Sequence, residues 1–569
     1  MKQKVLIFLV VSVFISAFIP TGGRIPVYAK KGMVVSASSI ASEIGRDILK
    51  SDGNAIDAAV ATAFALAVTW PAAGNIGGGG FIVYVDKNAK ATTIDFREKA
   101  PFAANEKMYL NEKGGLKEDL SNKIGVLSVG TPGTVAGLYL AHSKYGRLPW
   151  GKLVEPAIQL ASNGIPFSYS LNVQSNIYKE IWSNYPSTAK VMFKNGETIY
   201  EYGEIWKQPD LANTLRRIRD NGKDGFYKGE IAEKLTSFIK NQGGILTKQD
   251  LDQYEAIERE PLIGNYRGYS IITMGPPSSG GVALIEILNI LEGYDLNNLG
   301  YKSADYVHIL KEAIKRGFAD RAEFLGDPEF NQDMPIRRLT SKEYANRLRE
   351  GIMMNIASVS DSSKFGQIYD GGQNTTHLSV MDSEDNAVSL TYTLEQGYGS
   401  QVVAEGLGFF LNNEMGDFNP VPNITNNLGQ IGTKPNLIAP GKRMLSSMTP
   451  TILVKGNKPV IVIGSPGGRT IINTVLQVIL NLVDHDMNIA QAIEAPRIHH
   501  QWLPDRIEFE SMSLSKDTQA KLKERGHVLF ELPISTNLGA AMGIKVENKK
   551  GYITGAADSR SPDGGAVGY

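Results

Sequence analysis

The sequence predicts a mixed α/β or α+β protein with strands in at least two clusters, and not a simple alternation of strands and helices. Helical patterns dominate residues 148–350, whereas short strand-like segments alternate with polar turns from about Thr375 onward. No period of about 20–50 residues repeats along the chain, which argues against solenoids and propellers. These observations define the fold class before any single motif is considered.

The first predicted elements are two helices and a hairpin. Residues 39–50 place isoleucines on one helical face, and residues 52–54 (Asp-Gly-Asn) end that helix. Residues 55–68 are almost wholly apolar, which is typical of a helix buried on most sides. Residues 81–85 and 92–96 are β-rich and are joined by a short polar segment, so we expect a hairpin there.

Fewer elements stand out further along the chain. A strand-like segment at residues 269–274 interrupts the helical half. Residues 459–463 form an apolar run typical of a buried strand, and a helix is predicted directly after it at residues 470–483. Besides that helix, only a region near residues 517–525 has a clear helical pattern after Thr375.

The composition excludes several kinds of chemistry. The 569 residues include 59 basic and 59 acidic side chains, so the chain has no net charge that would attract nucleic acid. The sequence contains no cysteine, which excludes disulfides, thiolate metal sites and cysteine nucleophiles. We therefore expect chemistry that uses oxygen and nitrogen groups, without a nucleic-acid partner.

The first 29 residues have the pattern of an export signal. Lys2 and Lys4 precede an apolar run over residues 5–19, which is shorter than the roughly 20 residues that a membrane-spanning helix needs. The small residue Ala29 predicts cleavage after that position, and a non-cleaved anchor is the alternative interpretation. We expect an exported protein, periplasmic or extracellular, without a stable membrane span.

A second hairpin is predicted at residues 375–394. If Met381 pairs with Ala387, then Thr375 faces Thr393, whereas a slip of one residue would place a different side chain opposite Thr375. Taken alone, a threonine at the start of a strand reflects ordinary β propensity. The polar, Gly-rich segment 369–374 that precedes it gives the threonine a second interpretation.

A cut between Asn374 and Thr375 would make the threonine reactive. The new α-amine would have a pKa near 7.7–8.0, so a fraction of it is unprotonated at neutral pH. Such an amine can act as the base for the hydroxyl of its own residue. Thr375 is therefore a candidate nucleophile.

Residues 375–380 and 386–399 resemble the signature of the γ-glutamyltransferase (γ-glutamyl transpeptidase) family. Members of this family are N-terminal-nucleophile hydrolases made as one self-cleaving precursor. Asp385 stands where the family usually has glycine, in a turn where aspartate is tolerated. The resemblance extends from about Gly32 to the C-terminal Tyr569. It implies a four-layer αββα sandwich built from a large subunit, residues 30–374, and a small subunit, residues 375–569, after removal of residues 1–29.

The glycine-rich turn at residues 464–469 (Gly-Ser-Pro-Gly-Gly-Arg) follows a predicted strand and precedes a helix. Backbone N–H groups at a helix start can bind an anion. A phosphate loop would need Gly-Lys-Ser/Thr, and Ser465 lacks the spacing of a nucleophile elbow. A turn that needs glycine only for its backbone angles is the plain alternative. The resemblance implies that Gly467 and Gly468 form an oxyanion hole.

The earlier run Gly77–Gly80 leads into a strand, and we interpret it as close backbone packing.

A γ-glutamyl substrate carries an α-carboxylate and an α-ammonium group. Arg97, at a predicted strand end, suits a carboxylate, and an ion pair with Asp95 or Glu98 is the local alternative. The resemblance implies a larger set of roles: the α-carboxylate bound by Arg97, Ser446 and Ser447, the α-amine bound by Glu395, Glu414 and Asp417, and a hydrogen bond from Thr393 to the nucleophile.

Two further expectations concern metals and mobility. His499 and His500 would point to opposite faces of a strand, and no His-Glu-x-x-His motif is present, so we expect no metal site and no cofactor. Residues 417–442 are rich in Pro, Asn and Gly, and a loop of this length predicts a lid over the site.

The implied function is cleavage of the γ-glutamyl amide bond of glutathione and other γ-glutamyl compounds through a threonine acyl-enzyme. The glutamyl group would pass to an amino acid, a peptide or water. Two alternatives remain open at this level. One is a related acylase that acts on cephalosporins or poly-γ-glutamate, and the other is a secreted binding protein that kept the fold without catalysis.

Overall fold

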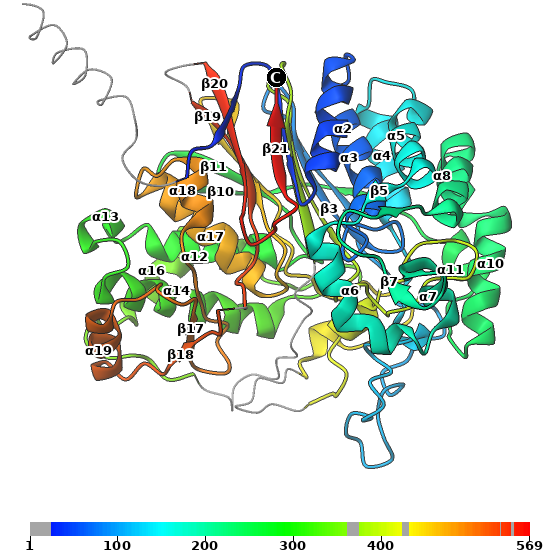
Figure 1. Ribbon diagram of the computed structural model, residues 1–569. Coiled ribbons are helices and arrows are strands. Elements are labelled where there is room, and N and C mark those ends of the chain that lie inside the picture. The colour runs from blue at the N-terminus through cyan, green and yellow to red at the C-terminus, as the bar shows by residue number, and fades with distance from the viewer. Residues whose placement is uncertain (1–23, 361–374, 424–431, 535, 548–550) are drawn as a thin grey trace, which may run out of the picture.

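The computed structural model describes residues 24–360, 375–423, 432–534, 536–547 and 551–569. Two seven-stranded sheets pack face to face, and helices cover the outer face of each (Figure 1). The order of layers is helix, sheet, sheet, helix, so the expected αββα sandwich is confirmed. The signal-like residues 1–23 lie outside the described residues. Within the described part of the chain, no helix is long and apolar enough to cross a membrane.

The first sheet contains Thr375, and its neighbouring strands are all antiparallel. Its strand order is β21 (Gly565–Gly568), β2 (Met33–Ser36), β12 (Thr375–Met381), β13 (Ala387–Thr393), β3 (Gly79–Val85), β4 (Ala91–Phe96) and β9 (Ile257–Arg259). Strand β12 lies in the interior of this sheet and is buried along its whole length. Met381 pairs with Ala387 and Thr375 with Thr393, so the structure has the first of the two registers considered and not the slipped one.

The second sheet lies behind the first. Its strand order is β1 (Val27–Ala29), β20 (Tyr552–Ala557), β19 (Met542–Glu547), β15 (Lys458–Gly464), β14 (Thr451–Lys455), β11 (Tyr269–Thr273) and β10 (Leu262–Tyr266). Strand β1 ends at the residue where the sequence predicts signal cleavage, and it pairs with β20. A cut after Ala29 would therefore remove an edge strand of this sheet, whereas a cut before Val27 would keep it.

Helices α2 (Ser39–Lys50), α3 (Ala55–Thr69) and α4 (Thr134–Tyr145) cover the first sheet. Helix α3 is buried at all 15 positions, as its uniform apolar sequence predicts. Asn54 and Asp57 form a capping box at its start, which satisfies backbone donors that this buried helix end would otherwise leave unpaired. Helices α5 (Trp150–Asn163) and α8 (Pro209–Asn221) pack outside this layer.

Helices α12 (Gly280–Leu291), α17 (Thr470–Val483) and α18 (Ile489–Glu494) cover the second sheet, and α14 (Ala304–Phe324) packs on α12. The bounds predicted for α2 and α17 from the sequence agree with the structure. Helix α18 is too short for the sequence pattern to reveal.

The remaining elements are short or peripheral. The helices are α6 (Tyr169–Trp182), α7 (Pro186–Met192), α9 (Asp224–Tyr227), α10 (Gly229–Asn241), α11 (Lys248–Asp252), α13 (Leu296–Leu299), α15 (Ile336–Leu339), α16 (Lys342–Glu350) and α19 (Lys516–Glu524), with 3₁₀ turns η1 (Val126–Ser128), η2 (Glu414–Asp417) and η3 (Lys434–Asn436). The strands are β5 (Ile165–Pro166), β6 (Phe193–Lys194), β7 (Thr198–Ile199), β8 (Ile205–Trp206), β16 (Ile498–His499), β17 (Ile507–Phe509) and β18 (Leu529–Glu531).

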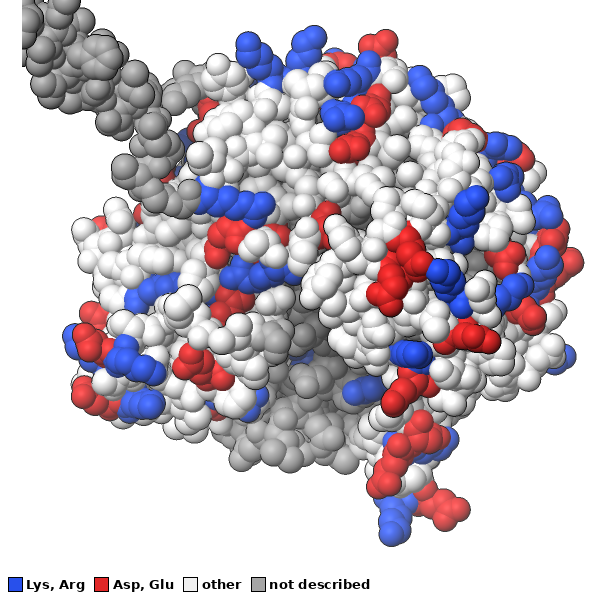
Figure 2. Space-filling view, in the orientation of Figure 1, with Lys and Arg blue, Asp and Glu red and all other residues white. Residues whose placement is uncertain are grey.

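Two local expectations are tested by the backbone and the surface. A Cβ atom added at Gly78 or Gly80 would overlap the carbonyl oxygen of Thr393 or Thr391, so the glycine run does serve close packing of β3 on β13. Basic and acidic side chains are intermingled on the face drawn in Figure 2, without a patch of one sign. On this face, the distribution matches the equal numbers of basic and acidic residues in the sequence.

Candidate active site

Thr375 is the first residue of β12 and is 6% exposed. Its hydroxyl donates a hydrogen bond to the hydroxyl of Thr393 across the β12–β13 pair, at 3.3 Å. The Thr393 oxygen in turn accepts a hydrogen bond from the backbone N–H of Glu395, at 2.8 Å. The antiparallel register therefore places one threonine where it holds the hydroxyl of the other. Asn374, the other half of the predicted cleavage site, lies outside the described residues.

Thr375 lines a cavity to which residues before and after the Asn374–Thr375 bond both contribute. Eight of the ten side chains or glycines predicted from the sequence line it: Arg97, Thr375, Thr393, Glu395, Asp417, Ser446, Ser447 and Gly468. Glu414 and Gly467 each adjoin a lining residue, since Glu414 pairs with Arg97 and Gly467 directly precedes Gly468. Residues separated by more than 300 positions in the sequence thus meet at one site.

The glycine turn has the geometry of an anion site. Gly467 has φ +133° and Gly468 has φ +56°, in the region that favours glycine. Their carbonyls accept hydrogen bonds from the first turn of α17, whereas neither glycine N–H donates one to another described residue. Gly468 lines the cavity, so these donors are available near Thr375. Ser465 is fully buried and donates to the Pro466 carbonyl, which makes it a structural residue.

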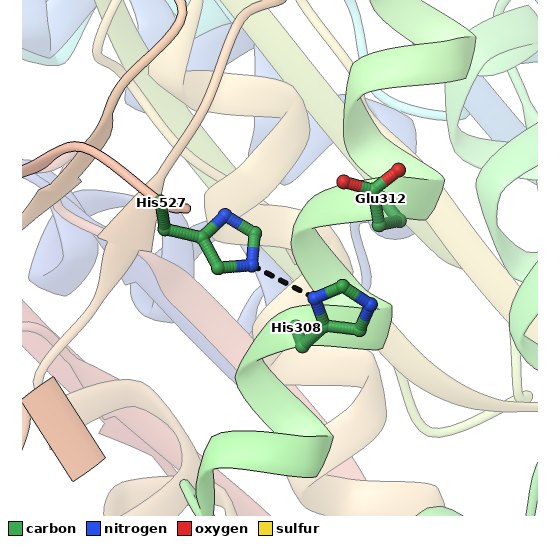
Figure 3. A group of neighbouring side chains, drawn as sticks. All are labelled: His308, Glu312 and His527. Atoms are coloured by element: carbon green, nitrogen blue, oxygen red, sulfur yellow. Dashed lines mark hydrogen bonds between the residues drawn. The ribbon is translucent and has the colours of Figure 1, made fainter. Parts of the chain in front are cut away.

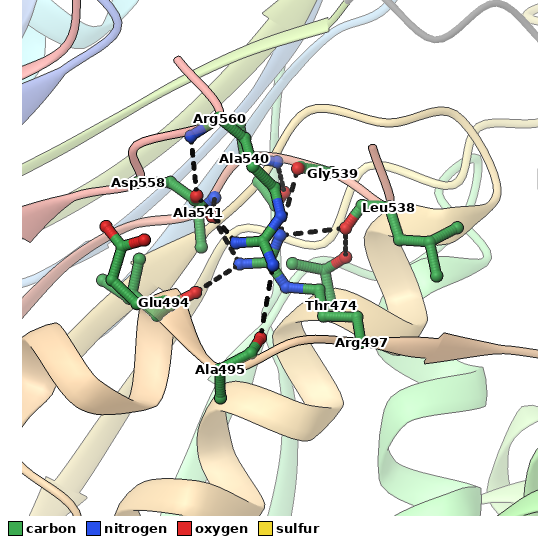
Figure 4. Close-up of polar contacts among 12 residues, drawn as sticks. Thr474, Glu494, Ala495, Arg497, Leu538, Gly539, Ala540, Ala541, Asp558 and Arg560 are labelled. Carbon is green, nitrogen blue, oxygen red and sulfur yellow. Dashed lines mark hydrogen bonds and ion pairs between the residues drawn. The ribbon is translucent and has the colours of Figure 1, made fainter. Parts of the chain in front are cut away.

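Buried ion pairs of Asp558 with Arg497 and Arg560 lie next to residues 538–541 (Figure 4). Arg497 pairs with Asp558 and donates to the carbonyls of Leu538 and Gly539, at 3.0 Å each. The next residue, Ala540, donates its N–H to the Ser465 hydroxyl at 3.1 Å. A chain of polar contacts therefore links the C-terminal segment to the strand end that carries the glycines.

Arg97 lies fully buried at the end of β4, surrounded by acidic side chains. Its Nη1 is 3.3 Å from Glu98 and 2.6 Å from Glu414, and its Nη2 pairs with Asp417. The ion pair with Glu98 that the local sequence suggested is therefore present. The carboxylate of Asp95 instead pairs with Arg259 and Arg443.

Burial alters the ionisation of this acidic cluster. It raises the pKa of Glu98 to about 8, although the charge of Arg97 opposes the shift. It also raises the pKa of Glu414 well above the usual range, and the neighbouring carboxylates add to that effect. Three carboxyl groups thus surround Arg97, and an ammonium group of a ligand would favour their ionised forms.

Ser446 and Ser447 precede β14 and are held by the segment before α12. The Ser446 carbonyl accepts hydrogen bonds from the N–H and the hydroxyl of Ser279, at 2.8 and 2.6 Å. The Ser447 hydroxyl accepts one from Nη2 of Arg321, at 3.0 Å. Sequence reasoning missed Ser279 and Arg321. One signal was available, since Arg321 lies three residues after Phe318 on the buried face of α14.

Asn436 is a second residue that the sequence did not reveal. Its side-chain amide donates to the Asp417 carbonyl at 2.7 Å, and its oxygen accepts from the Leu445 N–H at 2.9 Å. Asn436 therefore joins the segment that contains Asp417 to the segment that leads from Leu445 into Ser446 and Ser447. Asn436 lies in the 417–442 loop, of which residues 424–431 fall outside the described residues. The lid function of this loop stays a prediction.

One group in the described part of the chain has metal-ligand character: His308, Glu312 and His527 (Figure 3). His308 Nδ1 lies 2.8 Å from His527 Nε2, and His308 Nε2 lies 2.9 Å from the Met353 carbonyl. The carboxylate of Glu312 is already paired with Lys311 and Arg316. Burial lowers the pKa of His527 to about 3, and the Lys311 charge adds to the effect. Because cations surround the group, we assign it to hydrogen bonding between α14 and residue 527.

An αββα sandwich with a threonine at the start of an interior strand, beside a glycine-rich turn, is the architecture of an N-terminal-nucleophile hydrolase. The sequence model of the family described as gamma-glutamyltranspeptidase matches residues 41–568. The glutathione hydrolase proenzyme of Escherichia coli K12 is 44% identical over 549 residues, which cover 96% of this chain and 93% of that protein.

Solved structures agree with this assignment. The cephalosporin acylase of Bacillus halodurans superposes with a TM-score of 0.84 at 28% identity, covering 97% of this chain and 99% of that one. The γ-glutamyltranspeptidase of Helicobacter pylori is 43% identical, with a TM-score of 0.56, over 60% of this chain and 95% of that one. The chain belongs to the γ-glutamyltranspeptidase family and is an enzyme of the hydrolase and transferase type.

Proposed function

We propose that this protein cleaves the γ-glutamyl amide bond of glutathione and related γ-glutamyl compounds, and transfers the glutamyl group to water or to an amino-acid or peptide acceptor. One observation carries the proposal. Thr375 shares a single cavity with an acidic cluster, two serines and a glycine turn. These groups complement the α-ammonium, the α-carboxylate and the developing oxyanion of a γ-glutamyl amide.

In the proposed mechanism, the free α-amine of Thr375 takes the proton of its own hydroxyl, and the Oγ attacks the γ-carbonyl carbon. The N–H groups of Gly467 and Gly468 stabilise the resulting oxyanion. The C–N bond then breaks, the leaving amine takes the proton, and a glutamyl ester on Thr375 remains. Water or an acceptor amine attacks this ester and restores the hydroxyl. The hydrogen bond between Thr375 and Thr393 orients the nucleophile.

Maturation uses the same hydroxyl in this proposal. The Thr375 Oγ attacks the Asn374 carbonyl, and hydrolysis of the resulting ester leaves Thr375 as a new N-terminus. The products are a large subunit, residues 30–374, and a small subunit, residues 375–569. We also propose export to the periplasm or the medium, directed by residues 1–29, with the refinement that a cut before Val27 would retain β1.

The test combines mass spectrometry of the purified protein with a colorimetric assay on γ-glutamyl-p-nitroanilide. We expect a fragment that begins at Thr375, and we expect Thr375→Ala to abolish both the cut and the release of nitroaniline. Activity that survives Thr375→Ala would refute the mechanism. A single uncut, inactive chain in the unmodified protein would favour a binding protein of the same fold.

An acylase for another acyl group is the main catalytic rival, because the Bacillus halodurans cephalosporin acylase has the same fold. The fully buried Glu414 and the neighbouring Asp417 argue against it, since a glutaryl group has no ammonium to pair with them. Comparison of γ-glutamyl-p-nitroanilide with glutaryl-p-nitroanilide distinguishes the two. Faster turnover of the glutaryl compound would overturn the proposed specificity.

A further inference from the structure

The guanidinium group of Arg97 has no free donor in this structure. Its Nε contacts the Met444 carbonyl at 3.3 Å, its Nη1 contacts Glu98 and Glu414, and its Nη2 contacts Asp417 and the Leu445 carbonyl at 3.5 Å. An arginine has five N–H groups, and these are five contacts. An incoming α-carboxylate would have to compete with acidic side chains for Arg97, so the pocket needs another source of positive charge.

Arg321 on α14 offers that charge. It is 7% exposed and lines the same cavity. Its Nε donates to the Ser279 hydroxyl at 2.8 Å, and its Nη2 donates to the Ser447 hydroxyl at 3.0 Å. Among the described residues, no carboxylate forms an ion pair with Arg321, and its Nη1 has no hydrogen-bond partner.

A buried guanidinium without a counter-ion is costly, because desolvation of a charge is repaid only by a partner of opposite sign. Burial lowers the pKa of Arg321 to about 10, although the charge of Asp417 opposes the shift, and Arg321 is protonated at neutral pH. On the other side of the cavity, three carboxyl groups surround the single cation of Arg97, and an incoming ammonium group would favour their ionised forms. The cavity therefore has an acidic side that suits the ammonium end of an α-amino acid and a cationic side at Arg321 that suits its carboxylate end.

We propose that Arg321 is a second cation for the α-carboxylate of the glutamyl group and positions Ser447 to bind the same carboxylate. The inference rests on the proposed function, because it assigns the polarity of that substrate in that cavity. Its geometric basis is the direct contact between Arg321 and Ser447, which places any carboxylate bound by Ser447 within reach of the guanidinium. Arg469 also lines the cavity, but it belongs to the glycine turn.

The rival interpretation gives Arg321 only a structural role, as a brace for the segment 446–447 through Ser279. The two interpretations differ in their dependence on the substrate. Replacing a purely structural residue should affect every substrate that reaches Thr375. Replacing a residue that binds the α-carboxylate should affect only substrates that carry this group. The matched pair of substrates is γ-glutamyl-p-nitroanilide and 4-aminobutyryl-p-nitroanilide, which has hydrogen in place of the α-carboxylate.

We expect Arg321→Met to lower kcat/KM for the γ-glutamyl anilide by about 10- to 100-fold, mainly through KM, because it removes a charge-assisted hydrogen bond. The kcat/KM for the 4-aminobutyryl anilide should not change. Arg321→Lys retains the charge and should lose less. Arg337→Met, which removes an exposed arginine on α15, is the control and should leave both substrates unaffected. An equal loss on both substrates, or no loss on either, would overturn the proposal.

Calorimetric titration with L-glutamate and with 4-aminobutyrate gives a second readout that does not require turnover. If the wild-type protein binds glutamate but releases no nitroaniline from the anilide, the proposed function is refuted. The role of Arg321 can still be tested in that case, because the titration does not depend on turnover. We expect Arg321→Met to weaken glutamate binding selectively, and unchanged glutamate affinity would overturn the inference. If that variant does not fold, Arg321→Lys and Ser279→Ala decide the question by the same selectivity, since both disturb the position of the guanidinium.

Discussion

Replacement of Arg97 tests whether its positive charge stabilises the acidic cluster of Glu98, Glu414 and Asp417. The Arg97 side chain is 1% exposed, and its partners Glu98 and Glu414 are fully buried. Arg97→Met would preserve much of the volume and leave these carboxyl groups without their cation. Breaking a buried ion pair by removing one partner costs about 3–5 kcal/mol, so we expect a loss of that size in the free energy of unfolding above neutral pH.

The loss should depend on pH, and its sign can be worked out. The folded-state pKa of Glu98 is raised to about 8, so between the unfolded-state pKa and pH 8 the folded protein binds a proton that the unfolded chain does not. Its contribution to stability therefore falls as the pH rises through that window. Without Arg97, the pKa values of the carboxyl groups rise further and the decline extends to higher pH. The difference between wild type and Arg97→Met should thus be larger at about pH 9 than at about pH 6.

Urea denaturation at the two pH values measures this difference, and a double-mutant cycle with Glu414→Gln isolates the pair. The double variant should recover part of the lost stability, because it no longer buries the orphaned Glu414. Arg147→Met is the control, since its pair with Glu384 lies at the surface and should contribute little. A loss for Arg97→Met that equals the control, or that is independent of pH, would refute the electrostatic account.

Three further outcomes follow from the geometry. Gly467→Ala should lower kcat with little change in KM, because alanine is strained at φ +133° and its Cβ would overlap the Thr470 hydroxyl; steady-state kinetics on the anilide checks this, and an unchanged kcat would contradict the oxyanion assignment. Asn436→Ala should raise KM several-fold, about the effect of one or two buried hydrogen bonds, and a change confined to kcat would argue against its bridging role. His377→Gln should flatten the loss of stability below about pH 6.5, because burial lowers the pKa of His377 to about 3 and only the unfolded chain takes up its proton in that range; urea midpoints that decline as steeply as in wild type would show that other groups dominate.

The local features of the site could be predicted from the sequence. Alternation and turn composition predicted the hairpin and offered the register that pairs Thr375 with Thr393, with a slip of one residue as the alternative, and the glycine turn was visible between an apolar strand and a helix. These features depend on neighbouring residues, so a short window contains their signal.

Features that depend on distant pairing could not be predicted in the same way. Arg321 meets Ser447, and Asn436 meets Asp417, only because α14 and the 417–447 segment lie on opposite sides of one cavity. The burial of Glu414 likewise follows from the contact of η2 with Arg97. Strands as short as β1 and β9 exist because an adjacent strand offers hydrogen bonds, and their own sequences carry little pattern.

The position of β12 has a consequence for how this enzyme can be produced. The strand is bonded on one side to β2 and on the other to β13, so the reactive terminus would begin a strand in the middle of a sheet. Two separately synthesised chains would each expose unpaired strand edges, which invite aggregation before they meet. A single polypeptide that folds first and is cut afterwards avoids that hazard. We therefore expect recombinant production from one reading frame to succeed where co-expression of two fragments gives insoluble material.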